Sequence, residues 1–369
     1  METTLVAFAA FAAVSSYAGV TIDGLFDAGY QSNTLQGVRV SGIEGNGAGT
    51  SQLNFRGTED LGGGLAASFH LETDFSTMNN AANAGVPVTT SAGSVATQGN
   101  GGAFGNGEIL TALAGGFGKI GFGAINNAGL EYVVLISPDF GTAMGGGYKS
   151  TLRAETTGGG VRWANSVRYD TPVYGGFQAS IIGAGKQTGA NTPSMTVANT
   201  TAMGYVNVAG AQELSARYVA GPLKVLLVSS TTQQTSGTND TQRDLGVSYN
   251  LSDALSVQAG TQVTNFNSAA TPYTTNSKSV ASVYTVGQNK FAATFTGFSN
   301  NLAGKSNASE LGLGYDYLLS KTTKLYAHYA HLSDNTAASF AGDAGAYLAN
   351  TTSGQRTYTK SSFGVQIGF

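Results

Sequence analysis

The chain has 369 residues, a net charge of −3, 53 glycines, no cysteine, and only 18 basic and 21 acidic side chains. This is about half the charged fraction of an ordinary soluble domain. The absence of cysteine excludes a disulfide scaffold and thiolate chemistry, and the slightly negative charge excludes a nucleic-acid binder that works by bulk electrostatics.

The first 18 residues have the features of a secretory signal peptide. An apolar, alanine-rich stretch at residues 5–14 precedes Ser16-Tyr17-Ala18, a small-x-small site that predicts cleavage after Ala18. The start is atypical because it carries Glu2 and no Lys or Arg, and the alternative is a short buried helix of the mature protein. No later segment is apolar for the length that a membrane helix needs. We therefore predict an exported protein whose mature domain spans 19–369.

After this signal, apolar and polar residues alternate. In the first segment Val20, Ile22 and Phe26 fall on one face, whereas Asp23 and Asp27 fall on the other. Side chains of a β-strand point alternately to its two faces, so this period of two predicts a strand with one apolar and one polar side. The pattern recurs in sixteen segments. They start near Val20, Gln52, Gly64, Glu108, Lys119, Val161, Phe177, Ala211, Pro222, Gln242, Ala254, Ser279, Lys290, Glu310, Thr323 and Thr357.

The connections between these segments alternate between short and long. The short ones are tight turns by composition. They fall at 60–63, 115–118, 171–176, 220–221, 251–253, around 289, and at 319–322. The long ones fall at 31–51, 76–107, 126–160, 186–210, 232–241, 266–278, 300–309 and 333–356. Short turns on one rim and long loops on the other indicate an up-and-down antiparallel meander.

Sixteen strands in one sheet leave exposed edges unless the sheet closes, and a closed barrel of that size is too wide for side chains to fill. The polar face then lines water and the apolar face meets lipid, where every backbone group needs an internal partner. We predict an all-β protein, a sixteen-stranded antiparallel transmembrane β-barrel.

Four segments resemble the general porins of Gram-negative outer membranes, particularly the beta-proteobacterial and neisserial kind. The stretch at 51–65, SQLNFRGTEDLGGGL, is similar to their second-strand hairpin. Residues 115–118 and 165–177 agree with the same family, and 363–369 resemble its last strand with a terminal Phe.

The resemblance implies a homotrimer in the outer membrane, in which each barrel is a diffusion channel narrowed by an inward-folded third loop, at about 126–160 here. It also implies that Phe369 is the signal read by the outer-membrane assembly machinery. The other expected partners are outer-membrane lipid, lipopolysaccharide, and the small hydrophilic solutes and ions that pass through.

A pore selects by its diameter and by the charges at its narrowest point. Strand parity places a basic set and a second polar set on the lumen side. The basic set is Arg56, Lys119, Arg162 and Arg168; the second is Asp27, His70, Glu72 and Asp74. The predicted constriction loop contains Glu131, Asp139, Lys149, Arg153 and Glu155.

The resemblance implies a transverse field between the basic wall and the acidic loop, with Arg56, Arg162 and Arg168 at positions where the family usually has a wall Arg. Ala124 stands where a further Arg is usual, so the positive wall is thinner. The alternatives are that Arg56 pairs with Glu59 or another carboxylate, and that the loop acids form a solvated face.

Catalysis is not expected. The three histidines, at 70, 328 and 331, are too few for most metal or general-base sites, and no glycine-rich segment joins a strand to a helix. The sequence predicts a porin for passive diffusion, with no cofactor or metal. The alternatives are a substrate-specific channel on the same fold and a surface-exposed, β-rich adhesion protein.

Overall fold

The computed structural model describes residues 19–35, 38–45, 47–75, 77, 88–90, 93–95, 104–137, 162–185, 208–234, 237–267, 272–301, 307–334 and 356–369. The predicted signal segment 1–18 lies outside these residues. Within the described ranges, no helix is both long enough and apolar enough to cross a membrane.

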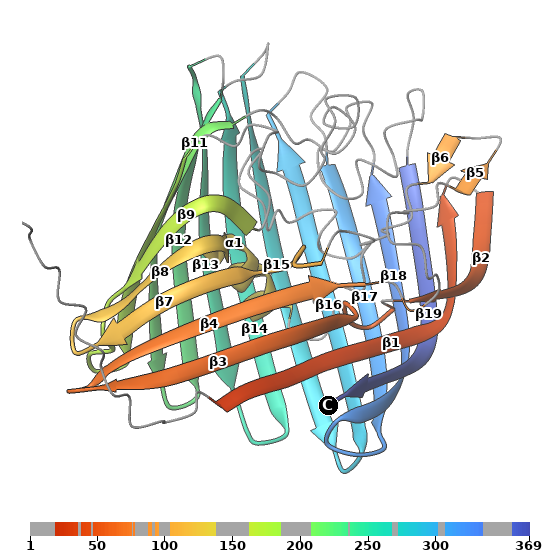
Figure 1. Cartoon of the computed structure of the whole chain (residues 1–369). Helices are drawn as coiled ribbons and strands as arrows, with labels where there is room; N and C mark the ends of the chain where they lie inside the picture. The colour runs from red at the N-terminus through yellow and green to blue at the C-terminus, as the bar shows by residue number, and fades with distance from the viewer. Residues whose placement is uncertain are drawn as a thin grey trace, which may run out of the picture.

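Sixteen antiparallel strands form one closed barrel (Figure 1). In chain order they are β1 (Gly19–Leu35), β3 (Gln52–Gly62), β4 (Leu65–Asp74), β7 (Ile109–Gly115), β8 (Gly118–Asn126), β9 (Arg162–Asp170), β10 (Phe177–Ala184), β11 (Val208–Ala220), β12 (Leu223–Gln234), β13 (Asn239–Asn250), β14 (Leu255–Phe266), β15 (Tyr273–Val286), β16 (Asn289–Asn300), β17 (Asn307–Leu318), β18 (Thr323–Asp334) and β19 (Arg356–Gly368). Each strand pairs with its neighbour along the chain, which confirms the predicted meander.

The first and last strands close the ring. One edge of β1 pairs with β19, from Leu25 opposite Gly368 to Leu35 opposite Tyr358. Its other edge pairs first with β3 and then, from Ala28 onward, with an extra strand, β2 (Val38–Gly45). A separate small hairpin, β5 (Val88–Thr90) and β6 (Gly93–Val95), lies in the second long loop.

The strand starts agree with the alternation pattern to within a few residues, with two exceptions. The prediction of a long loop at 31–51 is wrong, because β1 continues to Leu35 and turns back as β2. The hairpin of β1 and β2 extends the sheet past the point where the pairing of β1 with β3 ends. The strand expected near Ser279 begins six residues earlier, at Tyr273. There both faces are polar, with Thr274 and Asn276 pointing outward and Thr275 and Ser277 inward, so hydropathy alone does not reveal the strand.

The seven tight turns lie on one rim, together with the start of β1 and the end of β19 (Figure 1). Four of these turns are only two residues long, and two of the four begin with Gly221 and Gly287, whose φ angles are 53° and 58°. Side chains with a Cβ rarely adopt this left-handed conformation, so glycine is required there.

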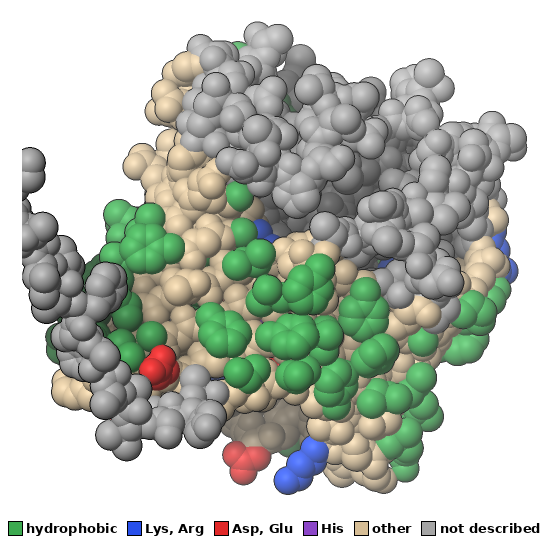
Figure 2. Space-filling view, in the orientation of Figure 1, with side chains coloured by type: hydrophobic (Ala, Val, Ile, Leu, Met, Phe, Trp, Pro, Cys, Tyr) green, Lys and Arg blue, Asp and Glu red, His purple; other side chains and the backbone are tan. Residues whose placement is uncertain are grey.

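The two faces of the wall have the polarity predicted from the sequence. Large apolar side chains point outward and are exposed, among them Val20, Ile22, Leu313 and Phe363. Figure 2 shows apolar side chains as a band over β1, β3, β4 and β19. The buried side chains of the strands are mostly polar and point inward. Because hydrocarbon is the natural surrounding of such a band, the outer surface is that of a protein in a membrane.

Asp27 lies on the inner face of β1, as parity predicts, but it does not face water. Its side chain is fully buried, and its carboxylate accepts hydrogen bonds from the backbone N–H groups of Gly47, Ala48 and Gly49 and from the Tyr326 hydroxyl, at 2.8–2.9 Å. The prediction of Asp27 as a lumen charge is therefore wrong: it anchors the chain after β2 against the inner wall. Three amide donors converging on one oxygen pair form a site for an anion, and the carboxylate fills it.

Candidate functional site

The inner wall between β1 and β10 carries a continuous chain of charged and amide side chains. At one end, Arg56 on β3 pairs with Asp23 on β1, with 2.9 Å between Nε and Oδ2, and Asn54 donates to the other oxygen of Asp23. The side chain of Arg56 remains 45% exposed. Its partner is thus a carboxylate of the neighbouring strand and not Glu59, so the Arg56 guanidinium is held in place while still facing the lumen.

The chain continues through His70 on β4. One ring nitrogen of His70 lies 3.0 Å from the Asn54 side-chain oxygen, and the other lies 3.0 Å from Glu108, just before β7. Glu108 also accepts the backbone N–H of Asn126 at the end of β8. His70 is therefore a buried link in the wall, and its exposed surface is too small to make it a main lumen contact.

Further round, Arg168 on β9 donates to the Asn126 carbonyl and pairs with Asp170 at 2.9 Å. Asp170 also accepts from Ser180 on β10. Lys119 on β8 stands opposite Asp170 in register, on the same inner face. These contacts place Arg168 and Lys119 on one stretch of wall, with the carboxylate of Asp170 between them.

Arg162, the first residue of β9, forms ion pairs with Glu72 and Asp74 on β4. Both acids are almost completely buried, whereas Arg162 is 27% exposed. Of this triad, only the guanidinium has substantial access to the lumen. Strand parity predicts Glu72 as a lumen residue in its own right, whereas in the structure it supports Arg162.

The third long loop begins with a short helix inside the barrel, α1 (Ala128–Ile136), which contacts β12, β13, β14 and β15. Asn127 caps the helix by accepting the Leu130 N–H. Glu213 on β11 accepts the Ala128 N–H at 2.6 Å, which places a carboxylate at the positive end of the helix dipole. Glu131 on α1 pairs with Arg217 on β11, with 2.6 Å between Nη2 and Oε2.

The packed face of α1 is apolar. Tyr132, Val133 and Ile136 are fully buried against Leu226 and Val228 of β12. Burial raises the pKa of the Tyr132 phenol, and the nearby carboxylate of Asp244 adds to this. Tyr132 therefore stays neutral, and the helix is held on the wall by apolar contact as well as by its two polar anchors.

Two glycines allow the helix to lie this close. Gly246 on β13 and Gly260 on β14 are directly opposite each other and face the lumen. A Cβ atom at Gly260 would lie 2.7 Å from the Tyr132 hydroxyl and 2.8 Å from Ile136. A Cβ at Gly246 would lie 3.0 Å from Tyr132. Gly246 and Gly260 together form a flat surface against which α1 packs, here called the glycine seat. The side chain of any larger residue would occupy the space that Tyr132 and Ile136 now fill.

Of the five residues predicted for the constriction loop, the structure describes only Glu131. The other four, Asp139, Lys149, Arg153 and Glu155, lie outside the described residues. Sequence reasoning missed Glu108, Glu213 and Arg217. Both Glu213 and Arg217 have the lumen parity of their strand, so the same rule that selected Arg168 would have found them.

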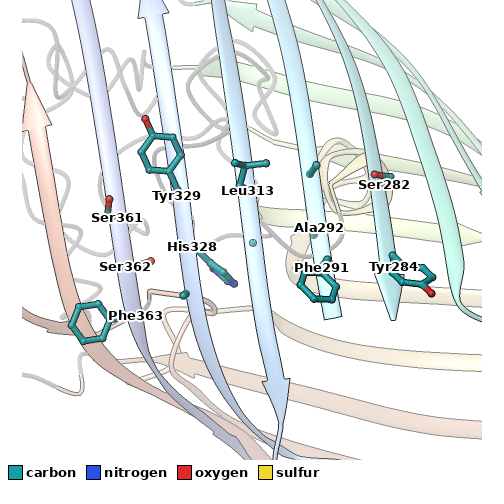
Figure 3. A pocket seen from close by; sticks show the side chains of 13 residues that line it. Ser282, Tyr284, Phe291, Ala292, Leu313, His328, Tyr329, Ser361, Ser362 and Phe363 are labelled. Carbon is teal, nitrogen blue, oxygen red and sulfur yellow. The ribbon is translucent and has the colours of Figure 1, made fainter. Parts of the chain in front are cut away.

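The outer wall has a shallow groove across β15 to β19 (Figure 3). Its outward-facing lining includes Tyr284, Phe291, Leu313, Tyr329 and Phe363. The groove is almost entirely apolar and lies on the surface that carries the exposed apolar band, so it belongs to the membrane-facing side and not to the lumen.

Comparison with known proteins gives consistent results. The family model for Gram-negative porins matches residues 3–337. Outer membrane porin protein 32 of Delftia acidovorans is 29% identical over 100% of this chain and 99% of its own length. An outer membrane porin protein of Bordetella pertussis is 33% identical over 178 residues, which are 48% of this chain and 40% of that protein.

Among solved structures, an anion-selective porin from Comamonas acidovorans aligns with a TM-score of 0.71 at 24% identity, over 95% of this chain and 100% of its own. OmpF of Salmonella typhi aligns with a TM-score of 0.63 at 12% identity, over 95% and 98% of the two chains. At these identities the likeness shows the fold.

The glycine seat gives a testable prediction. We expect Gly260→Val to push Tyr132 and Ile136 off the wall, to move α1 toward the barrel axis, and so to lower the single-channel conductance. Gly297→Val, on the outer face of β16, is the control for loss of a strand glycine away from α1, because nothing lies within 4 Å of a Cβ at that position. Equal conductance in both variants would contradict a role for α1 in narrowing the passage.

Proposed function

The chain belongs to the Gram-negative porin family and forms a channel of the outer membrane, and from this premise we propose that it passes small hydrophilic solutes and ions by passive diffusion. No catalytic step, cofactor or energy source is part of the proposal. A signal peptide at 1–18 would direct export, and its removal would leave Gly19 at the start of β1.

One observation carries the proposal: the closed barrel has an inner face of polar and charged side chains, including the exposed guanidinium of Arg56, and an outer face of exposed apolar ones. Such a lumen offers hydrogen bonds and a local field to hydrated solutes. Because the inward-facing Arg56, Arg162, Arg168 and Arg217 each have a carboxylate partner, charges of both signs line the passage. At Arg162 access favours the guanidinium, since Glu72 and Asp74 are buried behind it, whereas in the pair of Arg217 with Glu131 the carboxylate is the more exposed partner.

We further propose that the protein is a homotrimer with its long loops on the outer side of the membrane. OmpT of Vibrio cholerae, a structural neighbour, has been solved in a trimer form. The predicted constriction loop, at about 126–160, would narrow the channel, with Asp139, Lys149, Arg153 and Glu155 contributing charge near its narrowest point.

The deciding experiment is single-channel recording of the purified protein in a planar bilayer. Passive diffusion predicts ohmic current that does not saturate with salt, and a trimer predicts steps in groups of three. A saturable block by one sugar or one anion would instead support a substrate-specific channel. The absence of any conductance would contradict the proposal.

The wall arginines should set ion preference. We expect the double variant Arg56→Ala and Arg168→Ala to move the permeability ratio toward cations by about twofold or more, because Asp23 and Asp170 then lose their partners. The reversal potential in a salt gradient measures this. Lys321→Ala, in an exposed turn at the rim, is the control for loss of a positive charge elsewhere. An unchanged reversal potential in the double variant would show that both arginines are purely structural.

The terminal residue should matter for assembly. Phe369 exchanges two backbone hydrogen bonds with Gly24, and its exposed ring lies 5.8 Å from that of Phe26. We expect deletion of Phe369 to leave unfolded protein in the periplasm, whereas Phe369→Trp, which keeps an aromatic ring, should assemble. Heat-modifiable mobility of membrane fractions on gels gives the folded yield. A normal yield from the deletion would refute the assembly role of Phe369.

A further inference from the structure

His70 lies in the middle of the charged stretch of inner wall, between Arg56 and Arg168. It stands directly opposite Arg56 in the register of β3 with β4, so these two side chains are neighbours on the inner face. On its other side, Glu108 links it to Asn126, whose backbone carbonyl accepts a hydrogen bond from Arg168. Any change of charge at His70 or Glu108 therefore takes place beside both arginines.

Both ring nitrogens of His70 face hydrogen-bond acceptors. Nε2 lies 3.0 Å from the side-chain oxygen of Asn54, and the orientation of this amide is assigned by its nitrogen, which donates to Asp23 at 2.8 Å. Nδ1 lies 3.0 Å from Oε2 of Glu108, whose other oxygen accepts the backbone N–H of Asn126 at 3.0 Å. Each contact of the ring requires a hydrogen between the two atoms, so one hydrogen lies on Nε2 and a second lies between Nδ1 and Glu108.

These two hydrogens determine the net charge of the His70–Glu108 pair. Whether the shared proton sits on the imidazole ring or on the carboxyl group, the pair is neutral overall. Release of that proton to the water of the lumen leaves a neutral ring beside a carboxylate, and the pair then has a charge of −1. The inner wall thus holds a proton whose loss adds one negative charge between two arginines.

Charged groups face the pair from the strands that pack against it. Those that the structure describes are Arg56 on β3 with Asp23 on β1, Glu72 on β4 with Arg162 on β9, and Arg168 on β9. The side chains of His70 and Glu108 are only 10% and 17% exposed. Partial burial lowers the effective dielectric constant, so a charge on the pair acts on the nearest guanidiniums and on the ions that pass them.

We propose that the His70–Glu108 pair determines ion selectivity, being neutral when it holds its shared proton and anionic when it has lost it. In the neutral state, the guanidiniums of Arg56 and Arg168 dominate the field on this stretch of wall. In the anionic state, the added charge offsets part of that field, so the passage admits cations more readily. The proposal rests on the function given above, a channel for ions, and adds to it a dependence of ion preference on pH.

Glutamine variants separate the two charge states. The reversal potential in a salt gradient, recorded from about pH 5 to about pH 9, measures ion preference over the range in which histidine titrates. In the wild type we expect the ratio of cation to anion permeability to rise by about twofold as the pH increases. His70→Gln leaves Glu108 as a lone carboxylate, so its permeability ratio should be shifted toward cations at every pH, without the rise.

The double variant His70→Gln and Glu108→Gln should behave like the neutral pair. It removes both titratable groups, while two amides in sequence still provide donors toward Asn54 and an acceptor for the Asn126 N–H. We expect it to keep the low-pH preference of the wild type over the whole range. His331→Gln is the matched control, because it removes a histidine from the outer face of β18, and it should keep the wild-type pH profile.

Heat-modifiable mobility on gels establishes that each variant is folded before its currents are compared. A wild-type preference that does not change with pH would overturn the proposal, and so would a rise that survives in His70→Gln or is lost in His331→Gln. Should His70→Gln fail to fold, a rise that persists in the double variant would overturn it as well. Absence of any wild-type conductance would instead refute the channel function on which the proposal rests.

Discussion

The whole structure depends on the need of each backbone N–H and C=O group for a partner within the sheet, because hydrocarbon offers none. An open meander of sixteen strands would leave two edges unpaired. The pairing of β1 with β19 on one side and with β3 on the other removes both edges. Even the backbone of the last residue, Phe369, is bonded to Gly24. Closure at this strand number creates a lumen too wide for wall side chains to fill, and the channel follows from it.

Closure also decides where charge can lie. Charged side chains that face the lumen lie in a confined space where the field of each reaches its neighbours, and a buried charge without a partner is costly. The inner wall meets this requirement by pairing across strands: Arg162 with Glu72 and Asp74, and Arg56 with Asp23. In the first of these groups, the side chains of Glu72 and Asp74 are more deeply buried than that of Arg162. The guanidiniums of Arg56, Arg162, Arg168 and Arg217 are therefore oriented and accessible at fixed positions, each compensated by a carboxylate.

Because side chains alternate along a strand, the sequence was sufficient to predict strand number, turn positions and the side on which Arg56, Arg162 and Arg168 lie. Parity cannot show what covers a residue, and so it predicts Asp27 as a lumen charge although residues 47–49 enclose it. Nor can it identify a strand that is polar on both faces, as at the start of β15. Residues 223–228 depart from the alternation in the opposite way, because apolar side chains occur on both faces of this strand. Leu226 and Val228 are the inward-facing ones, and they pack against α1.

The inward-facing apolar side chains of β12 determine where α1 lies in the channel. Water-facing wall must be polar, so an inward-facing apolar patch on β12, next to the glycine seat of β13 and β14, is stable only when something apolar covers it. Helix α1 covers it, anchored by Glu213 at its first turn and by the pair of Glu131 with Arg217. The helix is thus fixed to the β12–β15 side of the lumen, while Arg56, Arg162 and Arg168 lie on β3 and β9. The position of α1, and with it the space left in front of these arginines, is set by the two glycines and the apolar patch as much as by charge.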